Sequence, residues 1–144
     1  MRTLPRREFL ALGACAVGCA ALGGCASTMT LPVTSDDGRI RVRLDELEGL
    51  SGSDGFVRLS PGGAAAPIYL LTLSDGSHAA LSPICTHLGC TVDVAGQRLV
   101  CPCHGSTYAR DGTVLRGPAE RPLRRYRVTE ATNGELVIHL EEGA

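Results

Sequence analysis

Cysteine and histidine residues gather in two short boxes in the middle of this 144-residue chain. The first box, residues 85–90, reads CTHLGC, and the second, residues 101–106, reads CPCHGS. Thiolate sulfur and imidazole nitrogen are the side-chain donors that hold zinc and iron in proteins. The two boxes therefore predict a metal site, and a site with four ligands leaves two of their cysteines for another role.

Two kinds of metal site fit this set of donors. A structural zinc ion accepts two cysteines and two histidines, and so does a mixed-ligand iron–sulfur cluster. A zinc site has no use for Cys90 and Cys103, nor for the hydroxyl residues Ser106 and Tyr108 that follow the second box. These additional residues favour the cluster, and a zinc-stabilised binding domain stays as the remote alternative.

The pattern Cys-x-His-x-Gly-Cys followed by Cys-x-Cys-His-x-Ser resembles the paired loops of Rieske iron–sulfur proteins, closely over about residues 83–120. The resemblance implies a 2Fe-2S cluster and assigns its ligands residue by residue. Cys85 and Cys101 would hold one iron and His87 and His104 the other, while Cys90 and Cys103 would form a disulfide. Neutral imidazoles in place of two thiolates lower the negative charge of the site, so an added electron costs less Coulomb energy.

The resemblance also assigns roles to residues around the boxes. Ser106 and Tyr108 stand where the family places hydroxyl groups that donate hydrogen bonds to cluster and ligand sulfurs. Leu88, Gly117 and Pro118 stand where the family covers the cluster. Each hydrogen bond to sulfur stabilises the more negative reduced state, which predicts a reduction potential in the upper part of the range of about −150 to +300 mV. Together with the disulfide, these hydroxyls favour the high-potential branch over soluble dioxygenase-type ferredoxins.

The rest of the chain predicts one all-β domain over residues 39–144. Ile40, Val42 and Leu44 alternate with arginines, as in a half-buried strand. Further apolar runs are separated by hairpin turns such as Asn133-Gly134. The expected fold is a Rieske-type antiparallel β-sandwich with an inserted cluster-binding subdomain at about residues 83–120. The net charge of −1 offers no basic stripe for nucleic acid.

The N-terminal segment, residues 1–25, reads as an export signal and not as part of the fold. Arg6-Arg7 resembles a twin-arginine motif, and residues 22–25, LGGC, resemble a bacterial lipobox that would lipidate Cys25. An uncleaved anchor helix is the alternative, although the apolar run is short for a membrane span, which needs about 20 residues. Residues 26–38 are interpreted as a polar linker. Both alternatives predict a bacterial protein tethered to the periplasmic side of the cytoplasmic membrane, where disulfides persist.

These observations predict an electron-transfer protein and not a stand-alone catalyst. We expect the iron–sulfur subunit of a membrane-associated, quinol-oxidising complex similar to cytochrome bc. Its donor would be quinol or a redox partner subunit, and its acceptor a c-type cytochrome. The alternative is the small subunit of a periplasmic molybdenum oxidase such as arsenite oxidase. No paired-carboxylate or nucleophile arrangement supports hydrolytic chemistry.

Overall fold

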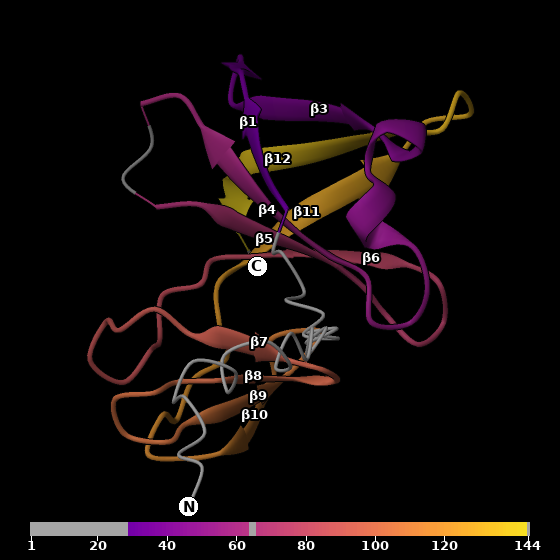
Figure 1. The fold of residues 1–144 in the computed structure, drawn as a ribbon. Coiled ribbons are helices and arrows are strands. Elements are labelled where there is room, and N and C mark those ends of the chain that lie inside the picture. Colours follow the sequence, from indigo (N-terminus) through magenta and orange to yellow (C-terminus); the bar gives the residue numbers. More distant parts are fainter. Residues whose placement is uncertain (1–28, 64–65, 144) are drawn as a thin grey trace, which may run out of the picture.

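The computed structural model describes residues 29–63 and 66–143, which form two stacked β-sheets (Figure 1). The prediction of an all-β Rieske-type fold is confirmed. In these described ranges, helical structure is confined to two short 3-10 turns, η1 (Leu44–Glu46) and η2 (Glu48–Leu50). The predicted signal and the lipidation site Cys25 lie outside the described residues. Within the described ranges, no helix is long and apolar enough to cross a bilayer.

The larger sheet carries eight strands in the order β1-β4-β5-β6-β11-β12-β3-β2. Their bounds are β1 Thr30–Val33, β2 Ser35–Asp36, β3 Arg39–Arg43, β4 Phe56–Pro61, β5 Ile68–Thr72, β6 His78–Leu81, β11 Arg125–Glu130 and β12 Glu135–Gly143. The strands pair in antiparallel fashion except β1, which runs parallel to β4. Because β1 and β2 are consecutive in the chain yet lie at opposite ends of this order, the sheet curls until its two edges meet.

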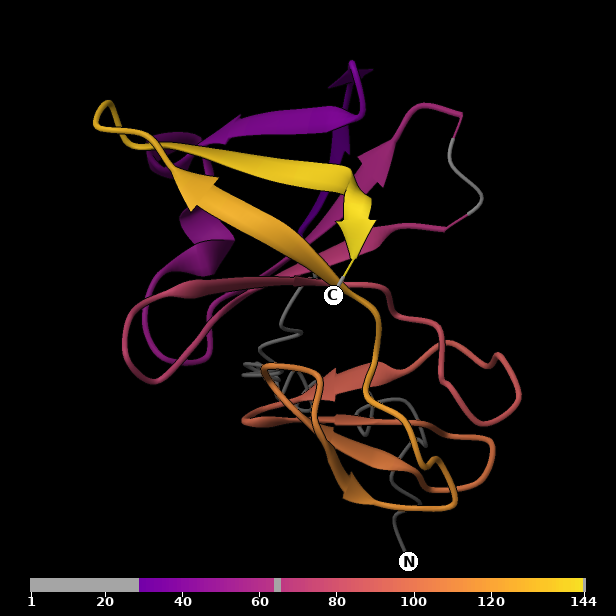
Figure 2. The same ribbon diagram turned by 180° about the vertical axis from the view of Figure 1, so that it is seen from behind.

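The smaller sheet is the predicted inserted subdomain. Its four strands are β7 Asp93–Ala95, β8 Arg98–Val100, β9 Thr107–Ala109 and β10 Val114–Arg116, in the order β10-β9-β8-β7. The β7–β8 hairpin joins the end of the first box to the start of the second, as the sequence predicted. Figure 2 shows from behind that this sheet packs beneath the larger one and is reached by the chain leaving β6.

The interpretation of residues 26–38 as a linker is wrong for residues 30–36. Thr30 to Val33 pair with β4, and Ser35 and Asp36 pair with β3, so this segment closes the curled sheet. Its side chains are exposed or only half-buried, and the partner strands lie far away in sequence. Strands of four and two residues, the first with a proline in it, give too short a pattern for the sequence to identify them.

Strand β5 separates two hydrophobic cores. Its five residues, IYLLT, are all buried. Successive side chains of a strand point to opposite faces, so Ile68 and Leu70 pack in the core of the larger sheet, whereas Tyr69 and Leu71 pack in the core shared with the smaller sheet. Burial on both faces explains why this strand reads as a continuous apolar run.

The junction between the two sheets is tied by hydrogen bonds as well as by packing. The Tyr69 hydroxyl donates to the carbonyl of Val92 at 3.0 Å and accepts from Arg58 Nη2 at 3.0 Å. The ring of Phe56 meets the ring of Tyr69 edge-on, with centroids 4.9 Å apart. The larger sheet is therefore linked to the first box in two ways. Strand β6 leads into the box, and Tyr69 binds Val92, which follows it.

Candidate metal centre

The two boxes fold into loops with the same main-chain pattern. In the first loop the N–H of Cys85 donates to the carbonyl of Cys90, and Gly89 donates back to Cys85; in the second, Cys101 pairs likewise with Ser106 and Gly105 with Cys101. Both glycines have φ near +80°, a conformation that costs glycine little and other residues considerably more. The sequence thus builds two equivalent turns that can face each other across one site.

The structure brings the four predicted ligands to these facing loops. The thiols of Cys85 and Cys101 are free and buried, with 2% and 1% of the residue exposed. The rings of His87 and His104 lie 4.8 Å apart, centroid to centroid, and nearly perpendicular. His87 is half-buried and His104 is exposed, so the thiols form the inner side of the site and the imidazoles its outer side.

One buried atom indicates that these residues fit a metal. Nδ1 of His87 is buried and has no hydrogen-bond partner among the described residues. A buried polar atom without a partner is costly unless it binds something else. A bond from Nδ1 to iron would satisfy this nitrogen, and free buried thiols supply the sulfur ligands that iron–sulfur clusters require. The assignment of the individual ligands stays a prediction.

The spacing of the donors argues against a single zinc ion. Ligands of one tetrahedral zinc lie within about 4 Å of one another, because each bond is only about 2.0–2.3 Å long. In the described part of the chain, one group of three or more possible ligand atoms lies within 4.8 Å of one another. It consists of the sulfurs of Cys90, Cys101 and Cys103. Two of these are joined in a disulfide, and the four predicted ligands do not form such a group.

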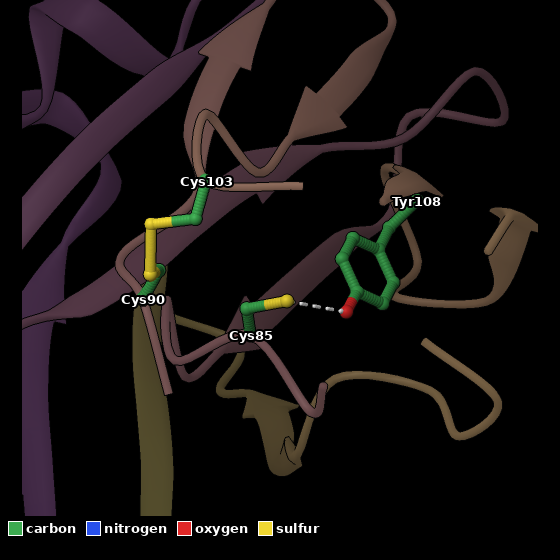
Figure 3. Close-up of a disulfide and its surroundings, with 4 residues drawn as sticks. All are labelled: Cys85, Cys90, Cys103 and Tyr108. Carbon is green, nitrogen blue, oxygen red and sulfur yellow. Dashed lines mark hydrogen bonds between the residues drawn. A yellow bond between two sulfur atoms is a disulfide. The ribbon is translucent and has the colours of Figure 1, made fainter. Parts of the chain in front are cut away.

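The predicted disulfide is confirmed. Cys90 and Cys103 are bonded and link the two loops beside the candidate ligands (Figure 3). The two cysteines occupy different positions of their equivalent turns, since Cys90 is the sixth residue of its box and Cys103 the third. The covalent link fixes the loops against each other on one side and leaves Cys85 and Cys101 as thiols.

Tyr108 meets Cys85 on the other side of the site. Its hydroxyl lies 3.2 Å from Cys85 Sγ, as Figure 3 shows, and it also accepts a hydrogen bond from the N–H of Thr86. Burial raises the pKa of the Cys85 thiol, but the hydrogen bonds it receives, that of Tyr108 foremost, outweigh burial and leave the pKa below its usual value. Burial and the neighbouring Cys85 raise the pKa of Tyr108, so its hydroxyl keeps the proton it donates. The surroundings thus make a thiolate at Cys85 easier to form than at a free cysteine.

A third loop closes the site. The buried Ser106 Oγ accepts a hydrogen bond from the N–H of Ala119 at 3.0 Å, and Thr86 Oγ1 donates to the carbonyl of Arg121 at 2.6 Å. The Ser106 oxygen keeps its own proton for donation toward the site. Leu88, Gly117 and Pro118, the residues predicted to cover the cluster, are all exposed on these loops, and their covering role stays a prediction.

Sequence reasoning missed Thr86, which ties the first loop to the third, and the buried Arg110, which follows β9. Tyr108 and Arg110 are two residues apart and both buried, a period that indicates one face of a strand. The partners of both residues are groups distant in sequence, the Tyr108 hydroxyl and the Arg121 carbonyl for Thr86 and three carbonyls for Arg110, which no local pattern reveals.

The curled sheet, the inserted four-stranded sheet and the two Cys/His loops define an iron–sulfur type of electron carrier site on a small β-domain. The family model of the Rieske [2Fe-2S] domain matches residues 49–127, more than half of the chain. The chain belongs to the Rieske [2Fe-2S] domain family, and a 2Fe-2S cluster is its cofactor.

Relatives of this chain are named as iron-sulfur subunits of the cytochrome b6-f complex. The chloroplastic cytochrome b6-f complex iron-sulfur subunit of Bigelowiella natans is 51% identical over 77 residues, which cover 50% of this chain and 30% of the relative. The cytochrome b6-f complex iron-sulfur subunit 1 of Synechocystis sp. is 46% identical over 79 residues, covering 52% and 44%. The chain thus spans less than half the length of these relatives.

Solved structures show the fold. The complex of reduced oxygenase and oxidised ferredoxin in carbazole 1,9a-dioxygenase contains a chain that matches with a TM-score of 0.54 and 21% identity, over 72% of this chain and 94% of that one. The Rieske monooxygenase CntA matches with a TM-score of 0.56 and 19% identity, over 67% and 30%. At this identity the likeness concerns the fold alone.

Proposed function

We propose that this protein is the Rieske electron-transfer subunit of a membrane-associated complex similar to cytochrome bc, with quinol as donor and a c-type cytochrome as acceptor. The family match and the relatives named as cytochrome b6-f subunits support it. They favour this function over the small subunit of a molybdenum oxidase. The predicted signal, the lipidation of Cys25 and the periplasmic location belong to the same proposal.

The buried thiols and the outward-facing imidazoles have different roles in the site. When bound, the cluster stores and releases single electrons. Cys85 and Cys101 would hold it on the buried side, where Tyr108 donates to the Cys85 sulfur. His87 and His104 would hold it toward solvent, and an exposed imidazole can accept a hydrogen bond from a quinol hydroxyl and take up its proton.

The exposed tip of the two loops suits an apolar partner, and this observation carries the proposal. Residues 83–90 and 101–106 contain no Asp, Glu, Lys or Arg. Leu88 is 68% exposed and Ile84 38% exposed. Charge-free, apolar surface around exposed histidine can enter a low-dielectric pocket without the cost of burying an unpaired charge.

Replacement of the exposed leucine tests this docking. Leu88→Glu would place a charge at the tip, and we expect the rate of cluster reduction by quinol, in membranes that contain the partner subunits, to fall at least tenfold. Thr132→Glu is the matched control, because Thr132 is exposed on the β11–β12 turn, at the end of the larger sheet away from the smaller sheet (Figure 1). Equal rates for the two variants, or no reduction of the wild type by quinol, would refute the proposed function.

A further inference from the structure

The side chain of Arg110 crosses the junction between the two sheets. The residue is 4% exposed. Its Nε donates to the carbonyl of Thr72 at 2.9 Å, its Nη1 to the carbonyl of Gly96 at 2.6 Å, and its Nη2 to the carbonyl of Gly55. Thr72 ends β5, Gly55 precedes β4 and Gly96 is the turn of the β7–β8 hairpin. One guanidinium therefore binds three segments that are distant in sequence.

The charge of Arg110 is balanced by dipoles and not by an ion pair. Within the described ranges, no carboxylate lies within 4.0 Å of Arg110. Burial lowers the pKa of Arg110, and the more distant Asp54 opposes this effect. A buried charge without a counter-ion is costly. The rigid fork of five donors, which lysine lacks, explains why arginine occupies this place.

The position of Arg110 in the chain relates it to the metal centre. Arg110 directly follows β9, two residues after Tyr108, and both residues are buried. Cys85 instead reaches the site from β6 of the larger sheet. Cys85 therefore lies on the loop that joins the larger sheet to the smaller one, whereas Tyr108 lies within β9. The 3.2 Å between the Tyr108 hydroxyl and Cys85 Sγ depends on how β9 is seated against this loop.

We propose that Arg110 is a positioning residue that seats the smaller sheet on the larger one, so that the Tyr108 hydroxyl can donate to the Cys85 sulfur. Arg110 thereby acts on the cluster through Tyr108, without contact to the cluster. The inference rests on the cluster site of the proposed function and on no statement about quinol or partner subunits.

The same junction offers a control contact. Gln97 Nε2 donates to the carbonyl of Ser53 at 3.2 Å and to the carboxylate of Asp54. These bonds also join the β7–β8 turn to the loop before β4, but they are exposed. Because water replaces an exposed hydrogen bond at little cost, Gln97→Ala should leave the seating of the sheet intact.

A double-mutant cycle tests the proposal on the full-length protein with its cluster. Arg110→Lys keeps the positive charge and loses the fork, so we expect a lower reduction potential, by at least half of the shift that Tyr108→Phe produces. In the Tyr108→Phe background, Arg110→Lys should produce no further shift. Gln97→Ala should leave the potential at the wild-type value. An unchanged potential in Arg110→Lys, or the same shift in both backgrounds, overturns the proposal.

A second readout covers the case in which Arg110→Lys holds no cluster. Amide hydrogen exchange of the purified variant should then show lost protection confined to residues 85–116, with the strands of the larger sheet still protected. Loss of protection throughout both sheets would show a general structural role and overturn the proposal. Neither readout uses quinol, so failure of the quinol assay leaves this inference standing and can be told apart from its own failure.

Discussion

The hydroxyl of Tyr108 on β9 and the sulfur of Cys85, on the loop between β6 and β7, lie 3.2 Å apart. Cys85 is a predicted cluster ligand on a loop that leaves the larger sheet, and Tyr108 stands in the middle strand pair of the smaller one. A hydrogen bond to a ligand sulfur stabilises the reduced, more negative state of a cluster. This contact therefore couples the packing of β9 against the Cys85 loop to the reduction potential.

Removal of that hydroxyl should lower the potential. A net hydrogen bond is worth about 1 kcal/mol, and for a one-electron couple 59 mV corresponds to a tenfold change, or about 1.4 kcal/mol. Tyr108→Phe should therefore lower the potential by roughly 40 mV in an EPR-monitored redox titration. Tyr126→Phe, on β11 in the larger sheet, is the control and should leave it unchanged. Equal potentials in Tyr108→Phe and the wild type would contradict the role given to Tyr108.

Ser106→Ala should also lower the potential, because the buried Ser106 hydroxyl can donate toward the site while it accepts the N–H of Ala119. Loss of the acceptor leaves the Ala119 N–H without its partner, so the third loop should exchange amide protons faster as well. Redox titration and hydrogen exchange measure the two effects on one preparation. A variant with loosened exchange and an unchanged potential would restrict Ser106 to a structural role.

The disulfide should contribute substantially to stability. Cys90 and Cys103 are separated by 13 positions, and closing a loop of this size is worth about 3 kcal/mol in the chain-entropy description. The double variant Cys90→Ala, Cys103→Ala should lose roughly that amount of unfolding free energy in denaturant titrations. Wild-type protein treated with a reductant should match the double variant. Identical unfolding curves with and without the disulfide would refute this expectation.

Gly55 should not tolerate a side chain. A Cβ added there would lie 2.1 Å from the carbonyl oxygen of Leu50 and 2.7 Å from Thr72 Oγ1. The neighbouring backbone would have to move, so Gly55→Ala should destabilise the protein by about 1–3 kcal/mol or more. Gly62→Ala is the control, because nothing lies within 4 Å of a Cβ at that position. Thermal unfolding of the two variants checks the expectation, and equal midpoints would contradict it.

The features that could be predicted from the sequence are those encoded by local patterns of residues. The two boxes identified the family and the disulfide, and alternating or continuous apolar runs identified strands such as β3, β5 and β6. The edge strands β1 and β2 were missed because they are short, because β1 contains a proline, and because their hydrogen bonds go to strands distant in sequence. Arg110 was missed for a related reason, since its partners are main-chain carbonyls of three separate segments.

Analysis of iron, acid-labile sulfide and zinc, followed by EPR of the reduced protein, tests the central claim most directly. The site described here predicts two irons and two sulfides per chain, no stoichiometric zinc, and the rhombic signal of a histidine-ligated 2Fe-2S centre whose potential lies in the range of about −150 to +300 mV. Stoichiometric zinc without an EPR signal would contradict the claim. It would leave a structural metal domain in place of an electron carrier.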